Sequence, residues 1–255
     1  MEIGILGVAT AGLRAQQSRI DYVGQNLANA DTTAYRALRP ELVDVPANSG
    51  TTAGLSQNQT TSLDRVVELA GLTQLDAPGP IVPTSSPLDV ALPANVYLAV
   101  QLPNGQTGYT RNGNLQVDSQ GRLQVDGNLL ASTVQIQPGQ TSPTLDAQGR
   151  VLTIGPRGSQ TIGTLPLVRI ANPDQLQPLG QGIYLTTTDS GPAQPTTLSG
   201  GTDSLTLDSL EGSNVQIAQE FGNLIRAQRA YQVGTQMIRT WDDLASDTVQ
   251  ELKHS

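Results

Sequence analysis

A seven-residue apolar repeat near the start of the sequence is the feature that most limits how this chain can fold. Two interleaved sets of residues each recur every seven positions: Leu6, Leu13, Ile20 and Leu27, with Ala9, Gln16, Val23 and Ala30 between them. Steps of three and four residues place these side chains on one face of an α-helix, and a sustained heptad repeat is typical of a coiled-coil seam. The sequence therefore predicts an N-terminal helix over residues 3–30, about 40 Å long at ~1.5 Å per residue.

The last forty residues carry a second stripe of the same kind. Its members are Ile217, Phe221, Leu224, Ala227, Tyr231, Gly234, Ile238, Trp241, Ala245, Thr248 and Leu252. Ser213 and Gln216 have the spacing of a capping box, and Asn214 is an alternative cap. We predict a helix over 213–252, and residues 1–30 and 213–255 together form a terminal helical domain.

The middle of the chain has the pattern of a β-domain. Short runs such as "VYLAVQL", "VLTIG" and "GIYLTT" alternate with turn residues, and "PNGQ" and "RNGN" place Asn-Gly where hairpin turns favour it. "DSQGR" and "DAQGR" predict turns rather than calcium loops, because each offers one carboxylate. The expected fold class is α+β, in which discontinuous N- and C-terminal coiled-coil helices enclose a β-rich domain over 87–212.

Residues 31–86 have no sustained period. They contain "PANSGTTAGLSQNQTTS" and "DAPGPIVPTSSP", with "LDRVVELAGL" between them as a candidate strand. We interpret this segment as an extended polar connector with little core of its own.

Composition excludes several classes of function. The sequence has no cysteine, and its single histidine, His254, is the penultimate residue, which argues against disulfides, thiolate metal sites and histidine-dependent catalysis. A net charge of −8 argues against nucleic-acid binding. No apolar run reaches the ~18 residues of a membrane span, so we expect no membrane insertion. We predict no catalytic, metal-binding or cofactor-binding residues.

Both predicted helices are weakened by glycine. The positions are Gly4, Gly7, Gly12, Gly24, Gly222 and Gly234. Each internal glycine costs about 1 kcal/mol relative to alanine, but small residues also let neighbouring helices approach closely. We infer that packing against other copies supplies the missing stability, with ends that fold on polymerising. The alternative is a two-helix hairpin packed on the β-domain of the same monomer.

The C-terminal end of the last helix is acidic. Asp242, Asp243, Asp247 and Glu251 lie where the helix dipole disfavours anions. Arg239 has the i,i+4 spacing to pair with Asp243. Candidate partners for the other acids, in neighbouring subunits, are Arg14, Arg19 and Arg36.

Several motifs, in this order along the chain, resemble the axial rod and hook proteins of the bacterial flagellum. "AGLRAQQSRIDYVGQNLANADTTAYR" is similar to their N-terminal signature, and "LEGSNVQIAQEFGNLIRAQRAYQ" to their C-terminal one. Between them, "SPLDVAL", "GYTRNGNLQVDSQGRL" and "NPDQLQPLGQGIYLTTTDSG" resemble the rod-protein β-domain. Within the family the chain looks most like the distal rod type, and the proximal rod type that shares this β-domain is the alternative.

This resemblance implies a structural, self-assembling subunit. In the family the terminal helices form an inner coiled-coil tube with the β-domain outside it, which makes a hollow, torque-transmitting shaft. The implied partners are further copies of the chain, adjacent rod and hook proteins, surrounding ring proteins and the flagellar type III export apparatus. The implied location is the basal-body rod in the cell envelope, and because "MEIGILGVATAGLRAQQ" lacks a basic n-region, we expect export without a cleaved signal.

The chain departs from the family pattern at two places. Ala34 stands where the family usually has glycine before the aromatic residue, so the turn lacks an easy positive φ. In the family, the corresponding strand is usually rich in glycine and contains two phenylalanines, and "PANVYLAV" stands in its place here.

The predicted contacts between subunits follow the seams and the two signatures. The residues are Leu6, Leu13, Ile20, Val23, Asn26, Leu27, Asn29, Leu224, Gln228, Arg229, Tyr231, Ile238 and Trp241. The seam residues could instead form an intrachain core. Asn26 and Asn29 could only cap the first helix, and Gln228 and Arg229 could only be a solvated face.

Two functions from other classes remain as alternatives. A cell-wall glycan hydrolase would use paired carboxylates among Asp89, Asp118, Asp126 and Asp146, but acids beside Asn-Gly and Gln-Gly sequences usually belong to turns. A secreted monomeric binding module with a helical stalk would keep its ligand affinity without residues 1–30, whereas a rod subunit would lose polymerisation.

Overall fold

The computed structural model separates the chain into two compact units. It describes residues 2–46, 65–74, 77–132, 134–137, 143–155, 158–201 and 203–254, and only the backbone for 2–8, 41–46, 65–74, 154–155, 158, 245 and 247–254. Unit 1 comprises Met1–Ala28, Leu38–Thr73 and Gln216–Ser255, and unit 2 comprises Asn29–Ala37 and Gln74–Val215. Both units are therefore discontinuous in sequence.

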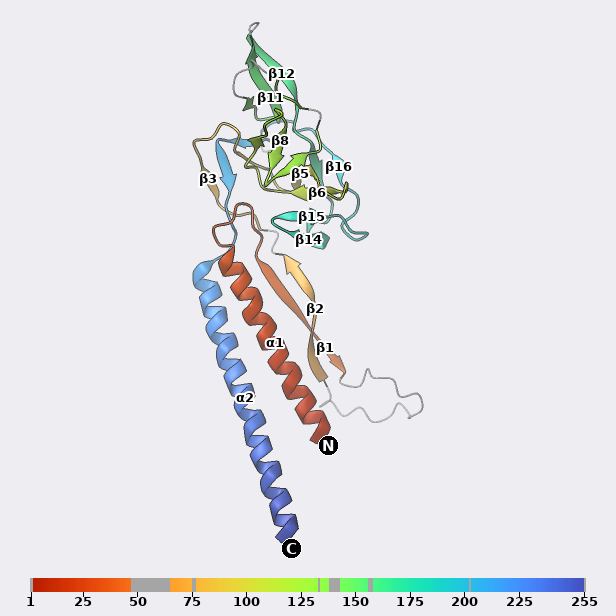
Figure 1. The fold of residues 1–255 in the computed structure, drawn as a ribbon, viewed down its shortest axis with the longest axis vertical. Coiled ribbons are helices and arrows are strands. Elements are labelled where there is room, and N and C mark those ends of the chain that lie inside the picture. The colour runs from red at the N-terminus through yellow and green to blue at the C-terminus, as the bar shows by residue number, and fades with distance from the viewer. Residues whose placement is uncertain are drawn as a thin grey trace. The chain divides into compact units, whose positions relative to one another are not determined.

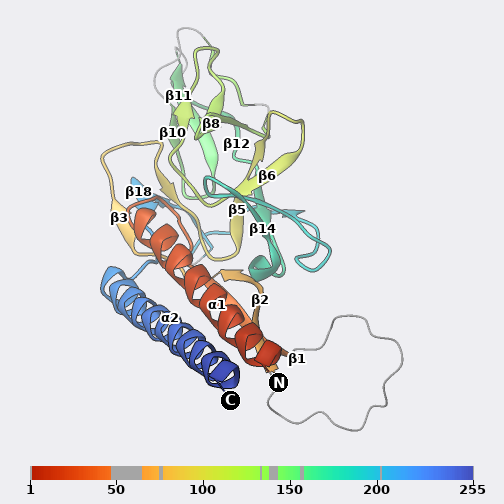
Figure 2. The ribbon, with the colours of Figure 1, turned by 60° about the horizontal axis from the view of Figure 1, so that its bottom comes forward.

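Unit 1 is built on two long helices, α1 (Glu2–Ala28) and α2 (Ile217–His254). They lie side by side and antiparallel, so the two chain ends are at the same end of the pair (Figures 1 and 2). Among the described helices, neither is long and apolar enough to cross a membrane. The fold class α+β, with terminal helices and a strand-rich middle, is thus confirmed.

The start of α2 differs from the prediction. The helix begins at Ile217 rather than at residue 213, and its first turn is closed by the hydrogen bond from Glu220 N to Gln216 O at 3.0 Å. Ser213 Oγ accepts instead from Val215 N at 3.3 Å. The capping-box prediction is wrong because Ser213 and Asn214 are used in an extended segment before the helix.

Two paired strands, β1 (Leu38–Pro46) and β2 (Arg65–Gln74), occupy part of the segment expected to be an irregular connector. The candidate strand "LDRVVELAGL" corresponds to β2, whose valines favour extended backbone. The β1–β2 ribbon lies along α1 (Figures 1 and 2). Residues 47–64, which hold most of the polar tract, lie outside the described residues.

Unit 2 is the β-domain, and the strand pairs formed by its described residues are antiparallel. Its largest sheet joins nine strands in the order β14-β15-β6-β5-β9-β8-β7, with β13 pairing both β5 and β16. These strands are β5 (Val96–Gln101), β6 (Thr107–Thr110), β7 (Gln116–Val117), β8 (Leu123–Val125), β9 (Asn128–Leu130), β13 (Leu167–Arg169), β14 (Gln177–Gly180), β15 (Ile183–Leu185) and β16 (Gln194–Pro195). A short 3₁₀ helix, Pro173–Gln175, precedes β14.

The described residues of unit 2 also form three smaller sheets. They are β10 (Thr144–Leu145), β11 (Arg150–Gly155) and β12 (Gly158–Thr164); β4 (Val90–Ala91) with β17 (Thr206–Leu207); and β3 (Ile81–Pro83) with β18 (Ser209–Glu211). The last two pairs join residues 81–91 to residues 206–211, which precede α2.

Strand β5 supplies side chains to two hydrophobic clusters. Val96, Leu98 and Val100 belong to the larger cluster, and Tyr97 and Ala99 to a smaller one that includes Ile170 and Tyr184. Because successive side chains of a strand point to opposite faces, the central sheet is covered on both sides at β5. The run "VYLAV" is apolar throughout for this reason.

The turns "DSQGR" and "DAQGR" are confirmed as hairpin turns, β7–β8 and β10–β11. One carboxylate oxygen of Asp118 accepts hydrogen bonds from the backbone N–H groups of Gln120 and Arg122, at 2.9 and 2.8 Å. Asp146 binds Gln148 N and Arg150 N in the same way. These carboxylates hold the turns in shape.

Of the two Asn-Gly hairpins predicted, one is wrong. "PNGQ" joins β5 to β6 with Gly105 at φ 82°, but "RNGN" links β6 to β7, which pair with other strands. Gly113 has no positive φ, and a Cβ there would lie 1.7 Å from Val90 O. The glycine is required because two backbones approach closely, a reason that a local turn pattern does not reveal.

Candidate assembly interface

The helix pair of unit 1 is held by the predicted seams and by one glycine. Leu224, Tyr231 and Ile238 of α2 are half-buried, and Ala227 is buried. A Cβ at Gly234 would lie 2.8 Å from Leu13 Cδ2, so glycine lets α1 approach α2 here. The seam therefore serves first as the packing surface between the two helices of one chain.

The predicted interface residues occupy three kinds of environment. Those half-buried or buried along the helix pair are Leu13, Ile20, Val23, Leu27, Leu224, Tyr231 and Ile238. Those exposed are Gln228, Arg229 and Trp241. Asn26 is buried, Asn29 is half-buried, and the side chain of Leu6 lies outside the described residues. A single chain does not test the contacts between copies, so these assignments stay predictions.

A second set of apolar side chains on α2 remains about half exposed. They are Ile217 (48%), Phe221 (52%), Ile225 (51%), Val233 (58%), Met237 (55%), Trp241 (42%) and Leu244 (55%). Ile217, Phe221 and Trp241 belong to the single stripe predicted from the sequence, whereas the other four residues were not predicted. Helical spacing was the available signal, because Ile225 follows Phe221 by four residues, and Met237 and Leu244 follow Val233 at steps of four and seven. Exposed apolar surface of this extent on one helix indicates an interaction site.

Part of this apolar surface is hollowed. A groove of about 440 Å³ is lined by Ala9, Gly12, Leu13 and Gln16 of α1 and by Arg229, Ala230, Val233, Gly234 and Met237 of α2. A second hollow of about 300 Å³ shares Val233 and Met237 with it and adds Gln236, Thr240, Trp241 and Leu244. We call the two together the helix-pair groove. It owes its depth to small residues, Gly12, Ala230 and Gly234 among them.

Asn26 fixes the chain as it leaves α1. Its amide exchanges two hydrogen bonds with the backbone of Leu38, donating to the carbonyl at 3.0 Å and accepting from the N–H at 2.9 Å. Its Nδ2 also lies 3.4 Å from Oε1 of Glu220 on α2. The side chain is 2% exposed. This gives the asparagine of the "NLAN" signature an intrachain role that links α1, β1 and α2.

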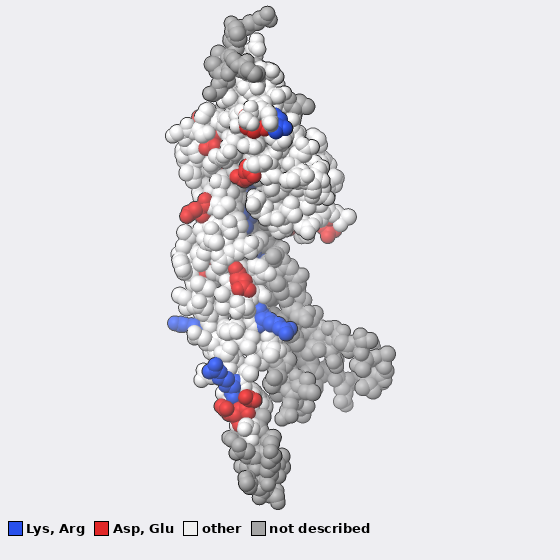
Figure 3. All heavy atoms as spheres, viewed as in Figure 1, with Lys and Arg blue, Asp and Glu red and all other residues white. Residues whose placement is uncertain are grey.

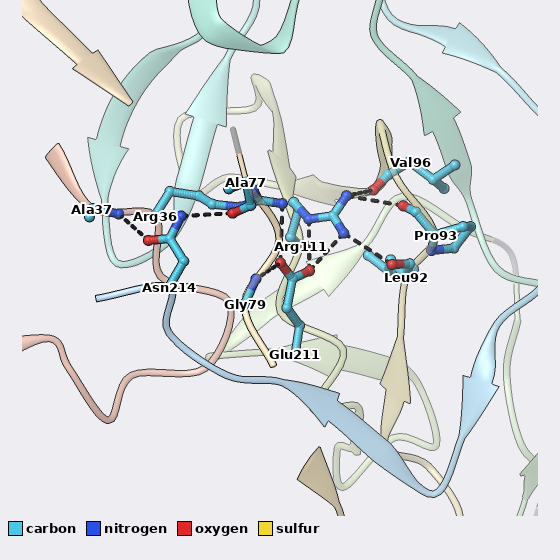
Figure 4. Close-up of polar contacts among 10 residues, drawn as sticks. All are labelled: Arg36, Ala37, Ala77, Gly79, Leu92, Pro93, Val96, Arg111, Glu211 and Asn214. Atoms are coloured by element: carbon cyan, nitrogen blue, oxygen red, sulfur yellow. Dashed lines mark hydrogen bonds and ion pairs between the residues drawn. The ribbon is translucent and has the colours of Figure 1, made fainter. Parts of the chain in front are cut away.

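In unit 2, Glu211 joins three distant parts of the chain (Figure 4). Its Oε1 lies 3.1 Å from a terminal nitrogen of Arg36 and accepts from Gly79 N at 3.1 Å. Its Oε2 accepts from Nε and a terminal nitrogen of Arg111. Arg36, Arg111 and Glu211 are 6%, 2% and 3% exposed. Together they form what we call the Glu211 cluster.

Arg111 also binds the β-domain backbone. Its guanidinium donates to the carbonyls of Leu92, Pro93 and Val96, at 3.0, 3.1 and 2.9 Å, and lies 5.5 Å from the ring centroid of Tyr97. A buried charge is costly unless its donors are satisfied, and these contacts meet that requirement. The cluster thus holds Arg36 and Glu211, which belong to the two ends of unit 2, to the rest of the β-domain.

Residues 34–37 and 211–214 also pair through their backbones. Ala34 N donates to Glu211 O at 2.7 Å, and Asn214 N donates to Tyr35 O at 3.2 Å. The Asn214 side chain accepts from Ala37 N and donates to Ala77 O, both at 2.7 Å (Figure 4). Ala34 adopts φ 56° despite its Cβ, so the turn uses the conformation that the absent glycine would make easy.

Two electrostatic expectations need correction. Arg36 was a candidate partner for acids of a neighbouring subunit, but it is buried against Glu211. Arg239 and Asp243 form no ion pair in the described part of α2, where both are exposed. Asp89 and Asp126, named for catalysis, accept from Asn114 and Asn112 as structural partners. Among the described residues, no group of three or more His, Cys, Asp or Glu side chains could hold a metal.

Comparison with known protein families separates three regions of the chain. Residues 6–36 match the flagella basal body rod protein family, residues 91–153 the flagellar hook protein FlgE/F/G D1 domain, and residues 208–251 the flagellar basal body rod FlgEFG protein C-terminal region. The Glu211 cluster takes one residue from each matched region: Arg36, Arg111 and Glu211.

Curated relatives cover almost the whole chain. The flagellar basal-body rod protein FlgG of Caulobacter vibrioides is 30% identical over 96% of this chain and 98% of its own length. FlgG of Buchnera aphidicola subsp. Schizaphis graminum is 31% identical over 94% and 96%. FlgF of Escherichia coli, also a basal-body rod protein, is 31% identical over 98% and 97%. The chain therefore belongs to the flagellar basal-body rod proteins, as a structural subunit of the rod whose similarity to FlgG fits the distal rod type.

Proposed function

We propose that this chain polymerises through its α1–α2 helix pair into the hollow, torque-transmitting tube of the distal rod. The observation that carries the proposal is the set of half-exposed apolar side chains of α2 described above. Burying these side chains in a partner is favourable, because complete removal of an apolar side chain from water contributes roughly 1.5–3 kcal/mol and about half of that surface is still exposed here. A coiled coil of terminal helices from several copies would cover it.

The predicted interface residues fall into two groups according to their exposure in the single chain. Gln228, Arg229 and Trp241 are exposed and available to a neighbouring copy. The buried or half-buried seam residues hold the helix pair and take part in subunit contacts only through their exposed atoms. Leu6 extends the α1 seam toward the chain end and completes the proposed interface set.

The remaining partners are proposed from family membership. They are the adjacent rod and hook proteins at the two ends of the polymer, the ring proteins around it, and the flagellar type III export apparatus that delivers the subunit without cleaving a signal. The location that follows is the basal-body rod within the cell envelope.

Electron microscopy and sedimentation of the purified chain test this function. We expect tubes or filaments above a critical concentration and monomers below it. Val233→Glu, which places a charge on a side chain 58% exposed on α2, is expected to abolish polymerisation. Leu179→Glu is the matched control, because Leu179 is 55% exposed in unit 2, outside the helix pair. If V233E polymerises like L179E, or if the native chain stays monomeric at any concentration, the proposal is wrong.

A further inference from the structure

The exposed apolar residues of α2 form two clusters on different sides of the helix. Phe221 and Ile225 are one turn apart and make a projecting pair, which we call the Phe221 ridge. Met237 lies 16 residues after Phe221, about 160° around the helix and about 24 Å along it, at ~3.6 residues per turn and ~1.5 Å per residue. Met237 belongs to the helix-pair groove together with Leu13 of α1. The same helix therefore carries a ridge on one side and a groove on the other.

From this arrangement we propose that the helix-pair groove of one copy receives the Phe221 ridge of the α2 helix of a second copy. The proposal rests on the proposed polymerisation and adds its pairing and register. Because the ridge and the groove lie on different sides of α2, one two-fold contact cannot place the ridge of each copy in the groove of the other. A head-to-tail contact covers both in every copy and repeats without closing as a dimer, as a rod requires.

The shape and polarity of the two surfaces support this pairing. The groove of about 440 Å³ has a floor of small residues, and the ridge presents two large side chains that are 52% and 51% exposed. Glycine at position 12 fits this role: a Cβ there would meet nothing within 4 Å in the single chain, so the chain itself gives no packing reason for a residue that weakens α1. On the face drawn in Figure 3, the described surface of the helices is largely uncharged, with scattered basic side chains, one acidic group over the upper part of the helix pair and another beside the grey C-terminal end.

Filling the groove is the first test. Gly12→Leu places a side chain where the ridge would dock, and Gly24→Leu is the matched control, because Gly24 is also open, lies on the same helix and does not line the groove. We expect G12L to raise the critical concentration for polymerisation at least tenfold and G24L to change it less than threefold. Equal critical concentrations for G12L and G24L would overturn the pairing. Circular dichroism of both monomers checks that the helices are retained.

Disulfide trapping is the second test, and it is clean because the native chain has no cysteine. Two single-cysteine chains of different mass, I225C and G12C, are copolymerised and oxidised, and the mixed dimer is quantified by mass. We expect it in several-fold excess over the mixed dimer of I225C with G24C. If the native protein polymerises but the two yields are equal, the register proposed here is wrong and the proposed function stands. If nothing polymerises, the function itself fails.

Discussion

Arg111 and Glu211, which are 100 residues apart in sequence, are joined by two hydrogen bonds to one carboxylate oxygen: from Nε at 2.9 Å and from a terminal nitrogen at 2.6 Å. The other oxygen receives Arg36 and the backbone of Gly79. One carboxylate thus faces two buried guanidinium groups, so its removal leaves both cations without their main counter-charge.

Glu211→Ala is therefore expected to destabilise unit 2 by about 3–5 kcal/mol, the usual cost of breaking a buried ion pair from one side. Asp203→Ala provides the control, because it breaks a more exposed ion pair. The side chains of Arg169 and Asp203 are 44% and 34% exposed, and losing their pairing is expected to cost less than about 1 kcal/mol. Urea unfolding of both variants measures the difference. Similar midpoints for the two would show that the Glu211 cluster is not a stabilising anchor.

Asn26 is expected to tolerate neither removal nor charge. Asn26→Ala leaves the Leu38 N–H and C=O without their partner and should cost about 1–3 kcal/mol. Asn26→Asp should cost at least as much, since a carboxylate cannot donate to Leu38 O and lies beside Glu220. Adding Glu220→Gln should recover part of the stability of N26D and none of that of N26A. Thermal unfolding followed by helical circular dichroism tests this, and an N26D variant as stable as the native chain would contradict it.

Ala34 is expected to accept glycine and reject valine. Its φ of 56° costs an L-residue about 1–2 kcal/mol, and glycine relieves that cost but loses a buried methyl group worth roughly 0.8 kcal/mol and adds unfolded-state entropy. Ala34→Gly should therefore change the free energy of unfolding by less than about 1 kcal/mol. Ala34→Val should cost more than about 2 kcal/mol, because a β-branched residue fits this conformation poorly. Chemical denaturation that ranks A34V equal to A34G would refute this.

The helix glycines are expected to respond differently to alanine in the dilute monomer. Gly24→Ala should stabilise α1 by about 1 kcal/mol, because its methyl group meets nothing within 4 Å. Gly234→Ala should stabilise the helix pair less, because the added methyl group would lie 2.8 Å from Leu13 Cδ2 and Leu13 must move to admit it. In a Leu13→Ala background the gain from G234A should rise to match G24A, which a double-mutant cycle measures. A gain from G234A that is independent of residue 13 would contradict the close approach.

Acidification is expected to weaken the "DSQGR" turn. The backbone N–H of Arg122, with smaller contributions from its guanidinium and from Gln120 N, holds the pKa of Asp118 below the ordinary 3.8. A carboxyl whose pKa is lower in the folded chain stabilises it above the unfolded pKa, and this contribution is lost as the pH falls through the folded value. The stability advantage of the native chain over Asp118→Asn should therefore begin to fall as the pH drops to about 3.8, and it should be lost only below the lower pKa of the folded chain. An NMR titration midpoint of Asp118 above 3.8 would contradict the assignment.

Local patterns in the sequence determined the parts of this protein that depend on neighbours along the chain. The heptad repeats gave both helices, and each "D-x-Q-G-R" run gave its turn, since Asp118 and Asp146 bind backbone groups two and four residues away. The motif "NLANADTTAYR" was sufficient to indicate the rod family. It could not indicate that Asn26 binds Leu38, because nothing within one helical turn distinguishes that use from a helix cap.

Only the tertiary structure decided the roles that depend on distant segments. Glu211, Arg36 and Arg111 meet because the first and last segments of unit 2 pair beside one sheet, and Gly113 is glycine because Val90 crosses it. The split of the α2 stripe into a packed seam and an exposed face was likewise hidden, since periodicity shows how many apolar faces a helix has but not which one its partner covers. Hydrogen bonding and packing between remote residues depend on how the whole chain folds, and one-dimensional spacing does not contain that geometry.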